Sequence, residues 1–129
     1  MVPAGHPWAR RRRPLTAAEL AATPLVVREP GSGTRETVEA ALRRAGAAAV
    51  KPLLELGSAS AVRNAVIAGA GPAVISELDV VREVAGRRLV PVAVAGVELG
   101  RVLRAVWPAG RRLSGPAAEL LTLAVKSGA

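Results

Sequence analysis

The apolar run Pro24-Leu25-Val26-Val27 passes through Arg-Glu-Pro-Gly-Ser-Gly-Thr directly into a helical pattern, with no linker between them. The β-branched residues predict a strand over residues 25–27. The next apolar residues recur at the i, i+3, i+4, i+7 spacing of an amphipathic helix, namely Val38, Ala41, Leu42 and Ala45. Gly46 then stands where a helix stops. A strand that runs directly into a helix can be the first half of a βαβ unit, in which the helix connects two parallel strands.

The same arrangement recurs further along the chain. Residues 53–56 predict a second strand, which runs into Gly57-Ser58-Ala59-Ser60 and then into a helix with apolar residues at Val62, Ala65 and Val66. Short strands are also predicted over residues 73–75 and 89–94, with a helix that begins near Ser76 between them. Strands that alternate with helices indicate βαβ crossovers, an α/β class and a mainly parallel sheet.

The flanking segments follow a different pattern. Thr16 and Glu19 form a capping box at the start of a short helix. Residues 101–107 predict a strand, and Ser114 is the expected cap of a final helix with Leu120, Leu121 and Leu123. We therefore expect residues 24–97 to form one compact α/β unit, and residues 1–23 and 98–129 to belong to a second one.

Composition narrows the possible environments and functions. A chain of 129 residues has room for one core, which must be aliphatic because there is no Phe or Tyr. The absence of cysteine excludes disulfides, a thiolate nucleophile and a Cys-based zinc site, and it fits a reducing cytoplasm. The first residues do not have the order of a signal peptide, and the longest uncharged stretch, residues 64–76, is too short to span a bilayer. We expect a soluble cytoplasmic protein.

The net charge of +8 raises the question of nucleic-acid binding. No helix-turn-helix or zinc-finger pattern is visible, and only Trp8 and Trp107 could stack on bases, so we interpret most arginines as solvated surface charge. Catalysis has no support, because His6 is the only histidine and no Gly-x-Ser-x-Gly elbow frames a serine. We predict no catalytic residue, no metal site and no cofactor.

The turn after the first predicted strand has the chemistry of an anion site. Gly31 and Gly33 allow unusual backbone conformations, and the following helix begins with free N–H groups and the positive end of its dipole. The hydroxyls of Ser32 and Thr34 can donate to an anion, or one of them can cap the helix, and both interpretations use the same atoms. The turn matches neither the dinucleotide fingerprint nor the P-loop.

Position in the sheet favours the ligand interpretation. In a parallel sheet the turn at Ser58 and the turn at Ser32 lie at the carboxyl ends of strands, where open α/β sheets bind ligands. We therefore predict a ligand site formed by four residues: Ser32, Gly33, Thr34 and Ser58.

Several phrases of the sequence, taken in order, resemble a known family. They are GHPWARRRRPLTAAELAATPLVVREPGSGTR, LELGSASAVRNAVIAGAGPAVIS, GRRLVPVAVAG and RVLRAVWPAGRRLSGPAAELLTLA. Together they resemble the effector-binding (substrate-binding) domain of LysR-type transcriptional regulators over nearly the whole chain.

The resemblance implies a periplasmic-binding-protein-like (type 2) fold, in which two α/β subdomains hold a small, often anionic effector in the cleft between them. Residues 24–97 would be the complete second subdomain, and residues 1–23 and 98–129 a remnant of the first. Ser32, Gly33 and Thr34 match the cleft loop of the family, and Ser58 matches its second cleft position. Members of the family also form homodimers.

Departures from the family pattern lead to a further expectation. The winged helix-turn-helix, the linker helix and the opening part of the first subdomain have no counterpart in this sequence, so we expect a truncated domain. DNA would then be bound only through a helix-turn-helix domain absent from this chain. The alternative function is a solute-binding domain of a transport system, which shares the fold, and an enzyme ranks third.

Overall fold

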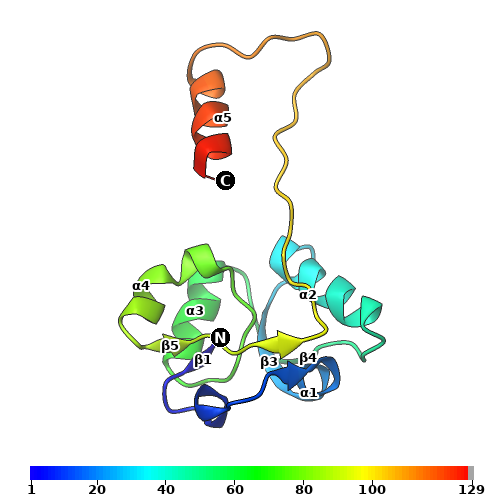
Figure 1. The fold of residues 1–129 in the computed structure, drawn as a ribbon, viewed down its shortest axis with the longest axis vertical. Helices are drawn as coiled ribbons and strands as arrows, with labels where there is room; N and C mark the ends of the chain where they lie inside the picture. Colours follow the sequence, from blue (N-terminus) through cyan, green and yellow to red (C-terminus); the bar gives the residue numbers. More distant parts are fainter. Residues whose placement is uncertain (128–129) are drawn as a thin grey trace.

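The computed structural model describes residues 1–127 and has a mixed α/β fold, as the sequence predicts. The elements from β1 (Val2–Pro3) to β6 (Val94–Ala95) form one body, and an extended segment leads from it to α5 (Pro116–Ser127), which stands apart (Figure 1). Between β1 and β6 the body contains, in chain order, η1 (Pro7–Arg10), β2 (Leu15–Thr16), α1 (Ala17–Ala22), β3 (Pro24–Arg28), α2 (Gly33–Arg44), β4 (Lys51–Leu56), α3 (Ala59–Ile67), η2 (Glu77–Asp79), α4 (Val81–Ala85) and β5 (Leu89–Val90).

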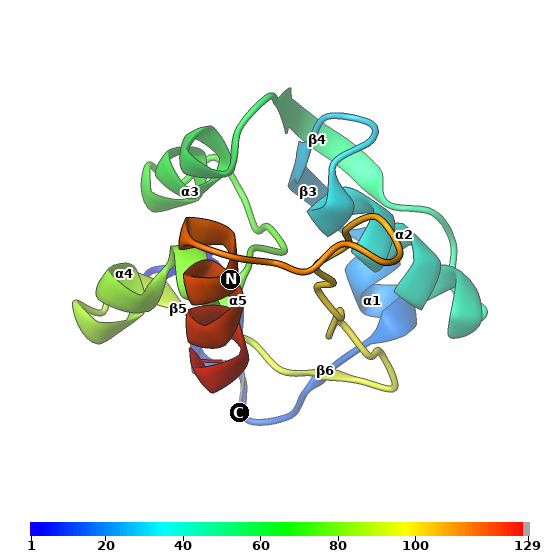
Figure 2. The same cartoon turned by 90° about the horizontal axis from the view of Figure 1, so that it is seen from above.

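Strand β3 lies at the centre of the body, and both of its faces are buried. Successive side chains of a strand point to opposite faces. Leu25 and Val27 pack in one cluster with α1 and α2, whereas Val26 packs in another with α3 and β5. Seen from above, α1 and α2 lie on one side of the body and α3 and α4 on the other (Figure 2). This double burial explains why the strand is an uninterrupted apolar run.

The strands pair two by two. Strands β3 and β4 are parallel, with Arg28 opposite Leu56 at their carboxyl ends, as expected for the predicted βαβ unit. Strand β1 pairs with β5 in the antiparallel sense, and β2 pairs with β6 in the parallel sense. Residues 1–23 are therefore joined to residues 24–97 by two strand pairings, and the division into two subdomains at these boundaries stays a prediction.

Two of the predicted strands differ from the observed structure. Residues 73–75 form no strand, although Val26 N donates to Pro72 O (2.8 Å) and Ala73 N to Met1 O (3.1 Å), so this stretch lies extended between β3 and β1. The predicted strand over residues 89–94 is divided into β5 and β6, which pair with different partners. Pro91 stands in the division, and a proline has no N–H to donate to a ladder.

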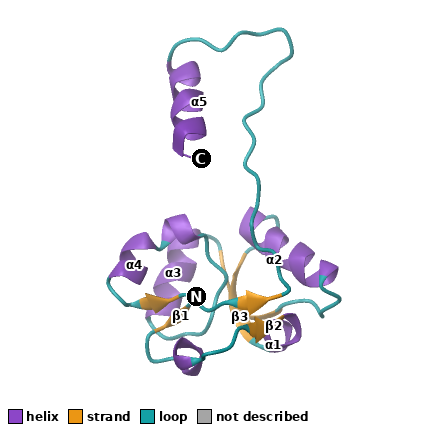
Figure 3. Cartoon of the chain, viewed as in Figure 1, coloured by secondary structure: helices purple, strands orange, loops and turns teal. Residues whose placement is uncertain are grey.

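The carboxyl-terminal predictions also need correction. Residues 101–107 form no strand, because the extended segment pairs with no other strand in the part of the chain that is described (Figure 3). Helix α5 begins at Pro116 and is preceded by Gly115, with φ of 59°, so Ser114 does not occupy the capping position. Proline at the first helical position is favourable because its missing N–H would have no partner there. No helix within residues 1–127 is long and apolar enough to cross a membrane.

The predicted capping box at the start of α1 is confirmed. Glu19 N donates to Thr16 Oγ1 (3.1 Å), and Thr16 N donates to Glu19 Oε2 (2.8 Å). Arg11 Nη2 also donates to Glu19 Oε1 at 2.6 Å. The bond from the Thr16 backbone, followed by the bond from Arg11, lowers the pKa of Glu19 to about 2. Stability from this carboxylate is therefore present above pH 4.5 and is lost as the pH falls toward 2.

Three helices end in the same way, with the Schellman pattern of hydrogen bonds. At the end of α2, Ala47 N donates to Leu42 O (2.9 Å) and Gly46 N to Arg43 O (3.1 Å). The residue in the left-handed conformation is Gly46 after α2 (φ of 68°), Gly69 after α3 (φ of 86°) and Arg87 after α4 (φ of 55°). Among the described residues, Arg87 is the one non-glycine with a positive φ.

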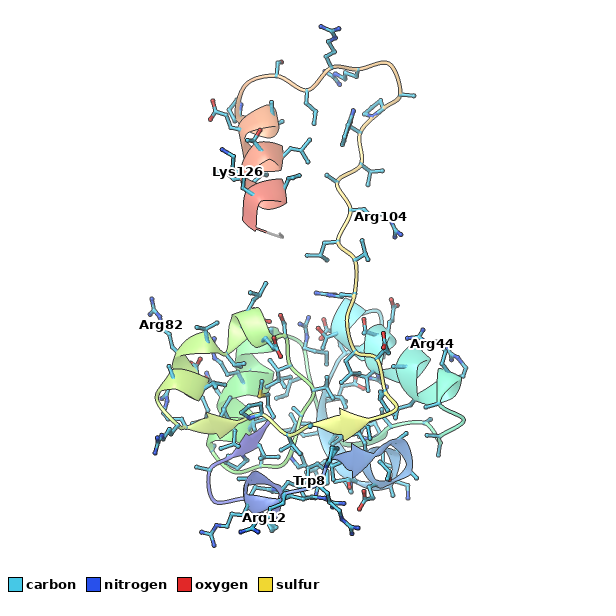
Figure 4. All side chains as sticks on the ribbon, in the orientation of Figure 1. Trp8, Arg12, Arg44, Arg82, Arg104 and Lys126 are labelled. Carbon is cyan, nitrogen blue, oxygen red and sulfur yellow. The ribbon has the colours of Figure 1, made fainter. Side chains whose placement is uncertain are left out.

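The substitution Arg87→Gly should stabilise the protein. A residue with a Cβ loses about 1–2 kcal/mol in the left-handed region, and the larger chain entropy of unfolded glycine offsets about half of this, so we expect a gain of about 0.5–1 kcal/mol. Urea denaturation measures this gain. Arg82→Gly is the matched control, because Arg82 is an exposed arginine inside α4 and points away from the body (Figure 4). Glycine at this helical position should cost about 1 kcal/mol. A loss of stability in Arg87→Gly would contradict this account of the helix end.

Candidate functional site

The candidate site begins at the turn that joins β3 to α2. Ser32 N donates to Glu29 O (3.2 Å), Pro30 and Gly31 occupy the central positions, and Gly31 has φ of 84°. These features define a type II turn, in which glycine is favoured at the third position. Gly31 thus has the unusual conformation that the sequence predicts, whereas Gly33 lies in the first turn of α2 with an ordinary φ.

The two predicted turns lie at the same edge of the sheet. Strands β3 and β4 end beside each other, and Glu29 N donates to Leu56 O (3.2 Å) just beyond the last paired residues. The structure therefore brings the turn of Ser32 and the turn of Ser58 to adjacent strand ends, as the parallel pairing predicts.

Arg35 links α2 to the ends of β3 and β4. Its Nη1 donates to Arg28 O (3.0 Å) at the end of β3 and to Glu55 Oε2 (2.6 Å) on β4, and its Nε donates to Glu39 Oε1 (2.8 Å) on α2. The bonds to Glu39 and Glu55 raise the pKa of the Arg35 guanidinium. The first turn of α2 is held in this way against both strand ends.

The two serines have different roles in their helices. Ser58 caps α3, because Ala61 N donates to Ser58 Oγ (3.1 Å). Ser32 occupies the corresponding position before α2, but its side chain makes no capping hydrogen bond, although the residue is only 7% exposed. The structure therefore distinguishes the two interpretations that the sequence leaves open: the Ser58 oxygen is used as a cap, whereas the first turn of α2 keeps its free N–H groups.

The two charged residues before the turn, Arg28 and Glu29, pair with each other. Arg28 donates two hydrogen bonds to the neighbouring Glu29, each of 2.7 Å. This pairing lowers the pKa of Glu29 to about 2, so Glu29 is ionised at neutral pH and bound to Arg28. The turn has no capping side chain, and a carboxylate or phosphate is the natural partner of such a helix end.

A cavity of about 700 Å³ opens beside α2. It is lined by Thr34 and Thr37 of α2, by apolar residues of the body such as Leu25 and Val38, by residues 72–79, and by Leu99, Gly100, Arg101 and Leu103. Cavities of this size hold small molecules. Of the four predicted site residues Thr34 lines this cavity, whereas Ser32, Gly33 and Ser58 lie outside its lining.

Two lining residues were not predicted. Thr37 lies one helical turn after Thr34, so the i, i+3 spacing could have indicated it. Arg101 had no such signal, because it is distant in sequence and comes from the extended segment after β6. Among residues 1–127, no group of three or more His, Asp or Glu side chains is arranged to hold a metal ion.

Comparison with known proteins identifies the family. The family model described as the LysR substrate binding domain matches residues 1–129. The chain belongs to this family. The LysR substrate-binding domain seen here is 51% identical, over 114 residues, to an uncharacterised HTH-type transcriptional regulator of Mycobacterium tuberculosis (strain ATCC 25618 / H37Rv), covering 86% of this chain and 36% of that protein.

Of two further relatives, one is named as a transcriptional regulator and the other as an import protein. The HTH-type transcriptional regulator CbbR of Xanthobacter flavus is 37% identical over 129 residues, which cover 100% of this chain and 39% of that protein. The phosphonates import ATP-binding protein PhnC of Anaeromyxobacter dehalogenans (strain 2CP-C) is 39% identical over 95 residues, which cover 72% of this chain and 19% of that protein. The LysR substrate-binding domain described here therefore spans little more than a third of the regulators that it matches.

The difference between the serines leads to a stability prediction. Ser58→Ala should lower the free energy of unfolding by about 1 kcal/mol, because it removes a helix cap. Ser32→Ala removes no capping bond and should change it by less than about 0.5 kcal/mol. Thermal and urea unfolding of both variants measure the two values. Equal losses in the two variants would show that Ser32 also caps its helix.

Proposed function

We propose that the chain is an effector-sensing domain of a LysR-type transcriptional regulator that binds a small anionic metabolite at Ser32, Gly33 and Thr34, with Ser58 at the adjacent turn. The observation that carries this proposal is the uncapped first turn of α2 beside the cavity that Thr34 lines. A buried serine without a partner at a helix start supports a ligand there, since free N–H groups and the helix dipole favour an anion.

The proposed architecture is the periplasmic-binding-protein-like type 2 fold, with residues 24–97 as one subdomain and the flanks as part of the other. Two observations support the assignment of residues 98–129 to the other subdomain. The segment after β6 leaves the body (Figure 1), and large apolar residues stay exposed on this segment and on α5. Residues 1–23 are paired with β5 and β6, so this flank packs on the proposed second subdomain. Their assignment to the first subdomain rests on the resemblance alone.

The proposed mechanism is a shift between arrangements of the two subdomains. A ligand stabilises the arrangement to which it binds more tightly, and its effect is limited by that difference in affinity. DNA would be contacted by a helix-turn-helix domain outside this chain, in a cytoplasmic homodimer. The relatives named as HTH-type regulators support this assignment, and we propose no catalytic role.

A second candidate is a ligand-binding domain of a transport system. The match to the phosphonate import protein favours it, but the matched region is only 19% of that protein. Fusion of the chain to a DNA-binding domain, followed by a reporter assay with and without candidate anions, separates the two functions. A response of the reporter to an anion supports the regulator, whereas anion binding without any response supports the transport candidate.

Small oxyanions should bind at the start of α2. Each hydrogen bond to a charged ligand contributes about 1.5–3 kcal/mol, so Ser32→Ala combined with Thr34→Val should weaken binding of the best ligand at least roughly tenfold. Calorimetric titration with inorganic phosphate, sulfate and a set of carboxylates measures the affinities. Thr122→Val is the matched control, because Thr122 carries a hydroxyl on the distant α5. Unchanged affinity in the double variant would remove Ser32 and Thr34 from the site.

The chain should also form homodimers. Helix α5 exposes Leu120 (68%) and Leu123 (62%), which lie on one face of the helix, and an apolar face of this kind is usually covered by another surface. A two-fold dimer would bury this apolar face, because the same surface of each copy would cover that of the other. Leu120→Lys should therefore shift the mass measured by light scattering from dimer to monomer. Leu78→Lys is the control, since Leu78 is even more exposed (83%) but lies on η2. A monomeric parent at all concentrations would refute this prediction.

A further inference from the structure

We propose that Arg101 is a specificity-determining residue of the ligand site, and that its guanidinium and the first turn of α2 together bind one oxyanion group of the ligand. The inference rests on the proposed function and adds to it a residue and a chemical class. The oxyanion is a carboxylate or a phosphate, since both accept hydrogen bonds from a guanidinium and from backbone N–H groups.

The geometry places Arg101 directly over the start of α2. A Cβ atom added to Gly33 would lie 2.5 Å from Arg101 Nη1 and 3.8 Å from Arg101 Cζ. Real Cβ atoms do not approach other atoms as closely as 2.5 Å. Because the φ of Gly33 is ordinary, the backbone does not require glycine at this position. The absence of a side chain at Gly33 instead leaves room for the guanidinium.

This placement brings two positive groups together. The amino-terminal end of a helix carries a partial positive charge, so a cation is unfavourable there unless an anion lies between them. Within residues 1–127, Arg101 makes no hydrogen bond or ion pair. The nearby carboxylates of Glu29, Glu39 and Glu55 are bound to Arg28 and Arg35.

The remaining carboxylates near the site do not neutralise Arg101. Glu77 and Asp79 line the same cavity, and Glu36 lies in the first turn of α2, but none of the three forms an ion pair with Arg101. The first turn of α2 thus contains one carboxylate, that of Glu36, whereas the Arg101 guanidinium has no ion-pair partner among residues 1–127. An oxyanion of the ligand would supply this partner.

Ser32 and Thr34 carry hydroxyl groups at the start of α2. Ser32 is 93% buried, by difference from its 7% exposure, and its hydroxyl makes no hydrogen bond with any described residue. Thr34 and Arg101 line the same cavity. The start of α3 lacks this arrangement, because Ser58 is occupied as a cap. The site for the charged group is thus at α2 and not at α3.

The position of Arg101 also suggests how binding is transmitted. Arg101 belongs to the extended segment that leaves the body and leads to α5 (Figure 1). An anion held by both Arg101 and α2 restrains the first residues of this segment against the body. Binding would then limit the orientations available to the part of the chain that follows.

The test uses the 129-residue chain with inorganic phosphate, sulfate and acetate as probes, and follows the backbone amide NMR signals of residues 33–35. Loss of one charge-assisted contact should weaken the affinity of Arg101→Gln for the best probe about tenfold. Arg104→Gln removes the same charge from an exposed arginine of the same segment, which projects to the side of the segment above the body (Figure 4), and should change the affinity less than twofold. Equal effects of the two substitutions would overturn the proposal, because only the net charge would then matter.

A double-mutant cycle tests the contact itself. Gly33→Ala should displace the guanidinium, which is the end of a flexible side chain, and so weaken binding in the parent. It should have no further effect in the Arg101→Gln variant. Additive effects would overturn the proposal. If the Ser32 and Thr34 substitutions weaken binding while Arg101→Gln does not, the inference fails and the proposed function stands. If the parent shifts no amide signal of residues 33–35 with any probe, the proposed site fails and the inference fails with it.

Discussion

Burial of β3 on both faces is the constraint on which the rest of the structure depends. Leu25 and Val27 require α1 and α2 on one side, and Val26 requires α3 and β5 on the other. Because each face is covered by a helix that follows a strand, both helices begin at the carboxyl edge of the β3–β4 pair. The arrangement that forms the core thereby also places two helix starts beside each other.

The two helix starts show that similar local sequences have different roles. Both have a serine before the first turn, but Ser58 bonds to the backbone of its own helix, whereas Ser32 leaves that backbone free. The cap at Ser58 satisfies a backbone N–H of α3 and stabilises the fold, whereas the N–H groups at the start of α2 stay available to an anion. Arg35 makes this possible, since it holds the first turn of α2 against both strand ends without using the free N–H groups.

A small charged group at this position would act on more than one part of the molecule. The turn at Ser32 belongs to the body around β3, whereas Arg101 belongs to the segment that leaves this body. A ligand that contacts both has a different affinity for different orientations of that segment, and this difference is the physical requirement for a ligand to change a conformational equilibrium. The membership of the chain in the LysR substrate-binding family is in keeping with such a role.

The sequence alone determined the local features of this protein. The apolar periodicities located β3, β4, α2 and α3, Thr16 with Glu19 identified a capping box, and the ordered motifs identified the family, because these signals depend on neighbouring residues. Tertiary structure decided which strands pair, and so divided the predicted strand at Pro91 and left residues 101–107 without a partner. It also decided that Ser32 is uncapped and that Arg101 lies at Gly33. These outcomes depend on contacts between distant segments, and no local pattern of residues encodes them.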